Sequence, residues 1–205
     1  PSLWTSWKAQ LLSELYNRTS RALRRGAANP LDIEEIKQER IDKVLSILEY
    51  ADVPEQAIHS LWEDFPDEYF LRHSSDEVAW QTQAIIRATL HGTEGSLPLV
   101  VIKDRAKRGG TPLFIYSDKS DNFFAHASIA LDRIGLSVVD ARIITTLSNK
   151  TLDTFMVLEQ DGNPVDDSDR KQQITQALYS VLRDPESVAN ISPQRIPRQL
   201  KPFDT

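Results

Sequence analysis

The chain contains no cysteine among its 205 residues. This absence excludes a disulfide framework, thiol catalysis, zinc–thiolate sites and iron–sulfur clusters. No apolar run approaches the roughly 18 residues that a membrane span needs. No signal peptide is visible at the amino end. We therefore expect a cytoplasmic protein that does not contact a membrane.

The chain also lacks the overall positive charge that is typical of proteins that bind nucleic acid. The formal net charge is −6, so we expect no nucleic-acid partner. Two local clusters are basic although the chain is acidic overall, and we interpret both as solvated faces. They are Arg18/Arg21/Arg24/Arg25 and Lys103/Arg105/Lys107/Arg108.

Motifs of known catalytic chemistry are missing as well. The four histidines are scattered, and the chain has no HExxH, GxxxxGK[ST], GxGxxG or GxSxG pattern. Acids cluster at Glu63–Glu68 and Asp166–Asp169. Pro66 interrupts the first cluster, which favours solvated acids over a divalent-ion site. The second precedes a predicted helix, where negative charge suits the helix dipole. We nominate no catalytic residue and no metal ligand.

Both ends suggest a piece of a longer protein. The chain begins at Pro1, its single methionine is Met156, and it ends in the proline-punctuated run SPQRIPRQLKPFDT. Such a tail is typical of a linker or a lone strand. We therefore expect an excised part of a larger protein, with a regulatory role.

What is present in the first ninety residues is helical periodicity. Apolar residues recur at three- and four-residue steps from Leu3 to Leu15, and again from Ile33 to Leu48. Pro54 starts a third, short helix through Trp62. Ser74 or Ser75 can cap a helix that runs to Leu90, with Asp76 or Glu77 in its first turn. The four tryptophans (Trp4, Trp7, Trp62 and Trp80) all lie in this half, where we interpret them as core residues.

The segment from Gly109 to Asp184 changes to a β-α-β-β-α order. Strand-like runs cover Thr111–Ser117, Val138–Thr146 and Thr151–Gln160. A helix is predicted over Phe123–Ile134, ending at Gly135, and a second one around Ile174–Leu182. This order is most of a ferredoxin-like unit.

The predicted fold class is therefore α+β, with helices followed by a ferredoxin-like βαββα(β) domain. We expect a helical connector over residues 1–94, a sheet domain over 97–190 and a linker or edge strand over 191–205. Leu99–Lys103 is expected to add an extra strand, hairpinned onto Thr111–Ser117. Gln199–Phe203 is the candidate fourth strand, restricted to an edge by its prolines. An open edge there, or along Leu113–Tyr116, would invite pairing with another domain.

The turn after the first strand of this unit is the candidate binding site. It delivers the chain to a helix N-terminus, whose unpaired amides and positive dipole end can receive a carboxylate. Two interpretations remain open: the turn holds a small zwitterion, or its polar residues only cap the helix. The candidate residues are Asp118, Lys119, Ser120, Asp121 and Asn122.

One run of the sheet segment is distinctive, from Asp153-Thr154-Phe155 to Gly162-Asn163-Pro164. Shorter segments accompany it: Arg108–Thr111, Phe114-Ile115, Phe123–Ala125, Leu131–Arg133, Leu136–Val138 and Asp140–Ile143, and in the helical half Leu3–Lys8, Leu11–Tyr16, Tyr69–Ser74 and Val78–Trp80. On these residues, the 110–165 stretch resembles an ACT domain, the amino-acid-responsive module. More specifically, it is similar to the first of two ACT domains in the bifunctional PII uridylyltransferase/uridylyl-removing enzymes of bacterial nitrogen control.

The resemblance implies a regulatory role in a two-activity enzyme. The family transfers uridylyl groups from UTP to a PII signal protein when glutamine is scarce, and removes them through a metal-dependent hydrolase domain when glutamine is plentiful. It implies that the catalytic centres, with their Mg²⁺ and UTP, lie outside this chain, and that this chain needs no cofactor. Glutamine and a second ACT domain, or another copy of this chain, are the implied partners.

Two departures from the family pattern limit what the resemblance implies about ligand binding. Ligand-binding ACT domains usually carry a glycine in the turn after the first strand, whereas this turn runs Asp118–Phe123 without one. Gln81 follows Trp80 where the family often has histidine, so a protonation switch at that position would be lost. The alternative functions are an ACT-type regulatory domain of another metabolic enzyme and a scaffold that only dimerises.

Overall fold

The computed structural model describes residues 12, 13, 16, 33–90, 97–103, 110–119 and 123–184. Helices α2 to α5 come first, then two strands, then helix α6, two more strands and helix α7. The bounds are α2 Ile33–Leu48, α3 Glu55–Trp62, α4 Asp67–Arg72, α5 Ser75–Leu90, β1 Leu99–Ile102, β2 Thr111–Asp118, α6 Phe123–Arg133, β3 Leu136–Thr145, β4 Lys150–Glu159 and α7 Ser168–Arg183.

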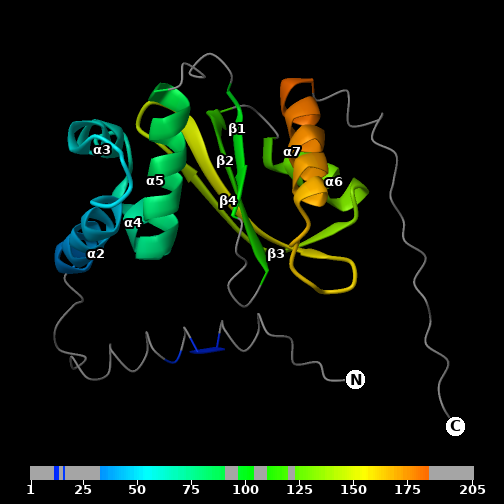
Figure 1. The fold of residues 1–205 in the computed structure, drawn as a ribbon, viewed down its shortest axis with the longest axis horizontal. Helices are drawn as coiled ribbons and strands as arrows, with labels where there is room; N and C mark the ends of the chain where they lie inside the picture. The colour runs from blue at the N-terminus through cyan, green and yellow to red at the C-terminus, as the bar shows by residue number, and fades with distance from the viewer. Residues whose placement is uncertain are drawn as a thin grey trace, which may run out of the picture.

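The four strands form one antiparallel sheet with helices on both faces. Helices α2 to α5 cover one face, and α6 and α7 cover the other (Figure 1). The strand order is β1-β2-β4-β3. The predicted α+β class, with helices ahead of an ACT-like sheet domain, is confirmed. Within the described ranges, no helix has the length and apolarity to cross a membrane.

Strand β2 shows why the two helical layers can share one sheet. Because successive side chains of a strand point to opposite faces, Phe114 and Tyr116 pack against α2 to α5 while Leu113 and Ile115 pack against α6 and α7. Seven of its eight residues are buried. A strand buried on both faces reads as a continuous apolar run rather than an alternating one, which is how Thr111–Ser117 reads in the sequence.

The predicted hairpin between Leu99–Lys103 and Thr111–Ser117 is confirmed. Leu99 pairs with Tyr116 and Ile102 pairs with Leu113, antiparallel. Strand β1 therefore lies beside β2 on the side away from β4. The prediction of an open edge along Leu113–Tyr116 is wrong, because β2 is hydrogen-bonded to β1 on one side and to β4 on the other.

The helical half and the sheet share a core across the expected domain boundary near residue 94. The α2 to α5 core includes Val44, Tyr69 and Ile86, and it continues into Ile144 and Leu152 of the sheet. The boundary at 94–97 remains a prediction about sequence organisation. Trp62 is buried and Trp80 is partly buried against this core, as expected, while Trp4 and Trp7 lie outside the described residues, as do Gln199–Phe203 and the basic cluster at Arg18–Arg25.

Local capping follows the sequence signals closely. Ser74 and Glu77 form a reciprocal capping box at the start of α5: the Ser74 amide donates to Glu77 (2.8 Å) and the Glu77 amide donates to the Ser74 hydroxyl (3.3 Å). Asp167 caps α7 by accepting from the Arg170 amide at 2.7 Å. Helix α4, a short helix of six residues between Pro66 and His73, was not predicted as a separate element.

Candidate ligand site at the end of strands β2 and β4

The candidate site residues lie where β2 ends and the chain turns towards α6. Asp118 is exposed and pairs with Lys150 at the start of β4, with Nζ to Oδ1 at 3.2 Å. The Lys119 amide donates to the Asn149 carbonyl at 3.1 Å. The structure thus brings Asp118 and Lys119 together with the β3–β4 turn. Ser120, Asp121 and Asn122 lie outside the described residues.

The first turn of α6 packs on strand β4. Phe123 is buried in the core beneath the helix, and Phe124 stacks on Phe155 with ring centroids 5.8 Å apart. Phe124 is half exposed. An 11-residue helix such as α6 offers unpaired amides and a positive dipole end at its N-terminus. The helix terminus expected beside the candidate turn is therefore present and lies over the β4 strand.

Asp153, on β4, is a buried carboxylate near this helix terminus. It lies opposite Ile115 of β2 and Ile143 of β3. Its exposure is 0%, and neither carboxylate oxygen has a hydrogen-bond partner within the described ranges. Burial raises the pKa of Asp153 to about 7, although the Thr151 hydroxyl lowers it in part. The sequence analysis named Asp153 only as part of a family motif. An acid in the middle of an apolar strand run was the signal that could have marked it.

Two hydroxyl groups lie next to Asp153 at the strand ends. Ser117 and Thr151 are cross-strand partners, both buried, with their hydroxyl oxygens 3.1 Å apart. Alternate residues of a strand share a face, so Thr151, Asp153 and Phe155 all lie on the face that α6 covers. This end of the sheet therefore places polar side chains beneath the first turn of α6.

On the other face of the sheet, a buried polar chain joins the helices to β4. The Tyr69 hydroxyl donates to Gln81 Oε1 (2.8 Å), and Gln81 Nε2 donates to the Thr154 hydroxyl (2.9 Å). His73 Nδ1 lies 2.9 Å from the Tyr69 carbonyl, and Nε2 lies 3.1 Å from the Thr154 hydroxyl.

The partners of His73 determine its tautomer. A carbonyl only accepts, so Nδ1 must carry the proton; Nε2 then accepts from the Thr154 hydroxyl. Burial, together with the nearby Arg142 guanidinium, lowers the pKa of His73 to about 4 against the opposing effects of the Tyr69 carbonyl and Glu77. The ring is therefore neutral at physiological pH. Gln81, which stands where the family pattern often has histidine, is fully buried and links Tyr69 to Thr154 in this hydrogen-bond network.

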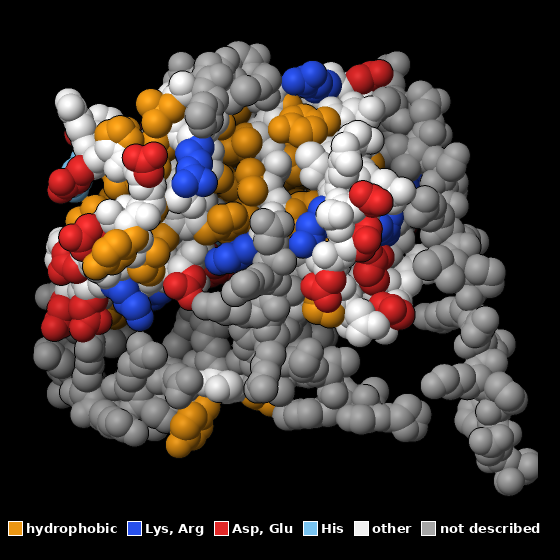
Figure 2. Space-filling model, in the orientation of Figure 1, with side chains coloured by type: hydrophobic (Ala, Val, Ile, Leu, Met, Phe, Trp, Pro, Cys, Tyr) orange, Lys and Arg blue, Asp and Glu red, His pale blue; other side chains and the backbone are white. Residues whose placement is uncertain are grey.

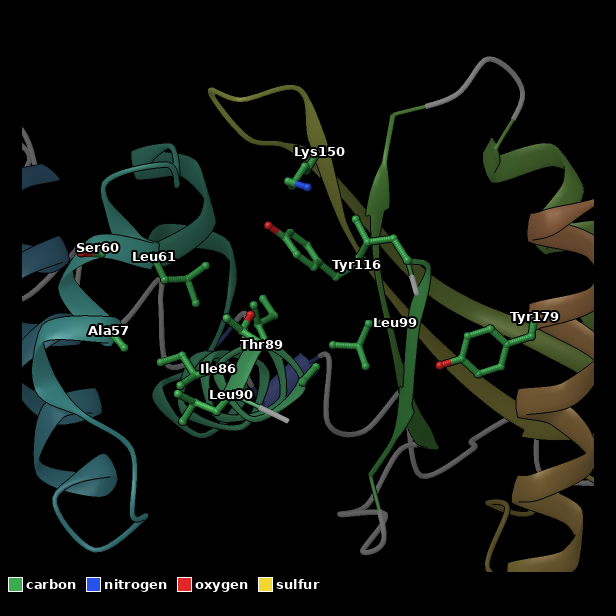
Figure 3. Close-up of a pocket in the computed structure, with 13 residues that line it drawn as sticks. Ala57, Ser60, Leu61, Ile86, Thr89, Leu90, Leu99, Tyr116, Lys150 and Tyr179 are labelled. Carbon is green, nitrogen blue, oxygen red and sulfur yellow. The ribbon is translucent and has the colours of Figure 1, made fainter. Parts of the chain in front are cut away.

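A pocket of about 640 Å³ opens between helices α3 and α5 and the β1–β2 hairpin (Figure 3). Figure 2 shows hydrophobic side chains gathered on this face of the molecule. The polar groups that line the pocket include the Tyr116 hydroxyl and Lys150, whose Nζ lies 5.6 Å from the Tyr116 ring centroid. Burial raises the pKa of Tyr116 to about 12, with contributions from Asp64 and Asp118, so the phenol remains protonated.

The other charged clusters have structural partners. Glu63, Asp67 and Glu68 are exposed, as the interpretation of solvated acids expects, while Asp64 also accepts from the Ser148 hydroxyl (2.6 Å) and so anchors the β3–β4 turn. Lys103, from the second basic cluster, lies 5.3 Å from the Trp80 ring centroid. Among the described residues, no group of three or more histidines, cysteines or acids could hold a metal ion.

Comparison with known proteins gives a consistent result. The family described as the fifth domain of uridylyltransferase GlnD matches residues 32–84. The chain is 44% identical over 208 aligned residues to the bifunctional uridylyltransferase/uridylyl-removing enzyme of Pseudomonas putida strain GB-1, covering 100% of this chain. The enzymes of Ectopseudomonas mendocina and Stutzerimonas stutzeri are each 43% identical over 99% of this chain. No solved structure matches.

These relatives are much longer proteins. The chain spans 23% of the length of each of these three enzymes. The match to residues 32–84 covers helices α2 to α4 and part of α5, and the full-length matches continue through the sheet. Over its whole length, this chain is therefore similar to one segment of the bifunctional uridylyltransferase/uridylyl-removing enzymes, a segment that makes up about a quarter of their length.

Proposed function

We propose that this chain is the amino-acid-sensing regulatory part of a bifunctional uridylyltransferase/uridylyl-removing enzyme, with glutamine as its ligand. The observation that carries the proposal is the match over the whole chain, at 44% identity, to enzymes with two opposed activities. Two opposed activities in one protein require a signal that selects between them. In this proposal the chain contributes no catalytic group, and the intact enzyme acts on a PII signal protein with Mg²⁺ and UTP bound elsewhere.

The fold supports a route for such a signal. The candidate ligand site lies on the α6 face of β4, whereas Thr154 of the same strand reaches His73 and Gln81 on the opposite face. Arg142 of β3 also bonds the carbonyl of Arg72, at the junction of α4 and α5. A shift of β4 caused by a ligand would therefore move groups that hold the helical layer.

The test is calorimetry of the 205-residue chain with glutamine, with glutamate and leucine as comparison ligands. We expect glutamine to bind and the other two to bind at least tenfold more weakly. Tight binding of a different amino acid with no glutamine binding would contradict the proposal. In a full-length relative, glutamine should switch the balance between uridylyl transfer and removal, and Asp118→Ala with Lys150→Ala should shift the glutamine concentration at which the switch occurs.

Pairing with a second ACT domain or another copy of this chain is a second candidate function. It is favoured by exposed apolar side chains on α6 and the edge strand β3: Phe124 (46% exposed), Ile129 (44%), Val138 (37%) and Ile143 (40%). Within the described ranges β3 pairs only with β4, so its outer edge is available. Solution scattering that shows a dimer, together with no thermal shift from any amino acid, would support a scaffold instead of a sensor.

A further inference from the structure

The pocket between helices α3 and α5 and the β1–β2 hairpin has the size of a small-molecule site. Its volume is about 640 Å³, within the range that ligand pockets span. Most of its wall is apolar: Leu61 comes from α3, Ile86 and Leu90 from α5, and Leu99 from β1 (Figure 3). A molecule that fills this space and leaves water favourably is therefore largely apolar itself.

Tyr116 presents an unpaired hydroxyl group to this pocket (Figure 3). Tyr116 is only 9% exposed, and the hydroxyl group of a buried tyrosine usually has a hydrogen-bond partner. Within the described part of the chain, the Tyr116 hydroxyl makes no hydrogen bond. Burial, with Asp64 and Asp118 nearby, raises the pKa of Tyr116 to about 12, so the group keeps its proton at physiological pH. The pocket therefore contains an O–H donor without an acceptor.

Lys150 places a positive charge at the same end of the pocket as the Tyr116 hydroxyl (Figure 3). Its ion-pair partner is Asp118, at 3.2 Å, whose side chain is 77% exposed. An exposed pair of this kind contributes little free energy. Asp64, the other acid near Tyr116, already accepts from the Ser148 amide and hydroxyl. An ammonium group has three N–H donors, so Lys150 can bind a second acceptor while it keeps Asp118.

We propose that this pocket binds an amphipathic monocarboxylate, with its carboxylate at Tyr116 and Lys150 and its apolar body against Leu61, Ile86 and Leu99. The two groups at the polar end are both donors. A carboxylate accepts from a phenol and an ammonium group at once, and such charge-assisted hydrogen bonds are the strong ones. Lys150 would repel a cationic head group, and a neutral alcohol would gain no charge-assisted bond. The inference goes beyond amino-acid sensing and does not depend on it.

Calorimetry with probes of equal chain length tests the class of ligand. The 205-residue chain is titrated with octanoate, 1-octanol and octylammonium, which share an apolar chain and differ in the head group. We expect octanoate to bind about tenfold more tightly than 1-octanol, because it alone gains charge-assisted hydrogen bonds. Octylammonium should bind most weakly. Equal affinities for these probes would show that only the apolar wall acts and would overturn the inference, as would the absence of octanoate binding.

Two variants test where the carboxylate binds. Tyr116→Phe removes only the hydroxyl group, and Lys150→Met removes the charge while keeping an unbranched side chain. Each should weaken octanoate binding about tenfold, and Lys150→Met should leave 1-octanol binding unchanged. Lys43→Met is the matched control, because Lys43 is an exposed lysine of α2 that does not line the pocket. Octanoate binding as tight in Y116F and K150M as in the wild type would overturn the inference.

Amide NMR on the wild-type chain gives a readout that needs no variant. On addition of octanoate, the largest shift changes should fall on Leu61, Ile86, Leu99 and Lys150. Changes centred on α6 instead would overturn the inference. Thermal unfolding provides a second readout: octanoate binds the folded chain and should raise its melting temperature, and a melting temperature that stays constant at saturating octanoate would contradict binding.

Glutamine binding separates this pocket from the proposed amino-acid site. Tyr116 packs on the face of the sheet that α2 to α5 cover, whereas the amino-acid site is proposed on the α6 face. We therefore expect Y116F to bind glutamine as the wild type does. Loss of glutamine binding in Y116F would show that the two sites are not separate and would overturn the inference. If the wild-type chain binds octanoate but no glutamine, only the proposed function fails.

Discussion

Arg142 on β3 and Glu77 on α5 form a two-point ion pair between the sheet and the helical layer. Nη2 lies 2.5 Å from Oε1, and Nη1 lies 3.1 Å from Oε2. Their side chains are only 14% and 16% exposed. Burial would raise the pKa of Glu77, but Arg142 overrides it and, with the Ser74 amide, lowers that pKa to about 2. The pair therefore stays ionised wherever the protein is folded at ordinary pH.

Removing one partner of this pair should destabilise the fold strongly. Arg142→Met leaves the Glu77 carboxylate buried and unpaired, and we expect a loss of about 3 kcal/mol in the free energy of unfolding. Urea denaturation measures it. The more exposed pair between Lys37 and Asp67 is the control, because Lys37→Met there should cost less than about 1 kcal/mol. Equal stability losses for Arg142→Met and Lys37→Met would contradict this prediction, because burial would then add nothing to the cost of breaking the Arg142–Glu77 pair.

Two buried groups should give pH dependences of opposite sign. The pKa of His73 is lowered to about 4 from 6.5. Between these two pH values the unfolded chain therefore binds a proton that the folded protein does not bind. Stability from this group is present above about pH 6.5 and falls by about 3 kcal/mol as the pH drops to 4. The pKa of Asp153 is raised to about 7 from 3.8. Here the folded protein holds the extra proton, so stability falls by about 3 kcal/mol as the pH rises from 4 to 7.

In the wild-type chain these two effects largely cancel between pH 4 and 7, and single variants should reveal them. We expect Asp153→Asn to become more stable with rising pH over this range, and His73→Gln to become less stable. Denaturation midpoints at half-unit pH steps provide the measurement. Parallel curves for wild type and both variants would refute the opposed titration.

Gly110 should tolerate no side chain. It has φ of +127°, and a Cβ there would lie 2.9 Å from the Val157 carbonyl oxygen and 3.1 Å from Met156 Cγ. We expect Gly110→Ala to cost about 3 kcal/mol from backbone strain and this contact together. Gly162 has φ of +84°, and no atom lies within 4 Å of the position that a Cβ would take there, so Gly162→Ala should cost only about 1 kcal/mol. Thermal unfolding that ranks the two variants the other way would contradict this reasoning.

A sheet domain separated from the helices at the expected domain boundary should not fold stably on its own. A piece covering residues 97–190 would expose Phe114, Tyr116, Ile144 and Leu152, which pack against the helices. We expect this piece to aggregate or to bind a hydrophobic dye, whereas the 205-residue chain unfolds in one cooperative transition. A soluble, cooperatively folding 97–190 piece would show that the two parts are independent domains.

Local elements were predictable because their signals are short-range. The strand predicted over Thr151–Gln160 is observed at Lys150–Glu159, and the helix predicted over Phe123–Ile134 is observed at Phe123–Arg133. Periodicity and caps act within a few residues, so one sequence displays them. Helix α4 was missed because six residues between two turns carry too little periodicity to be recognised.

The candidate site was predicted only in part. The turn after β2 and the α6 terminus follow from element order, and the structure places Asp118 and Lys119 there. The burial of Asp153 could not be predicted from the turn or from the element order, because it depends on residues of β2, β3 and α6 that are far away in the sequence. The role of Gln81 likewise depends on Tyr69 and Thr154 reaching it across the interface.

By itself, the sequence determined the order of helices and strands, the α+β class and the family, since these depend on local periodicity and on residue-by-residue similarity. Only the tertiary structure decided that β2 lies between β1 and β4, that helices cover both faces of the sheet, and that Asp153 is fully buried. These features arise from contacts between residues distant in sequence. Burial and hydrogen-bond satisfaction are properties of such contacts, so no pattern along the chain can express them.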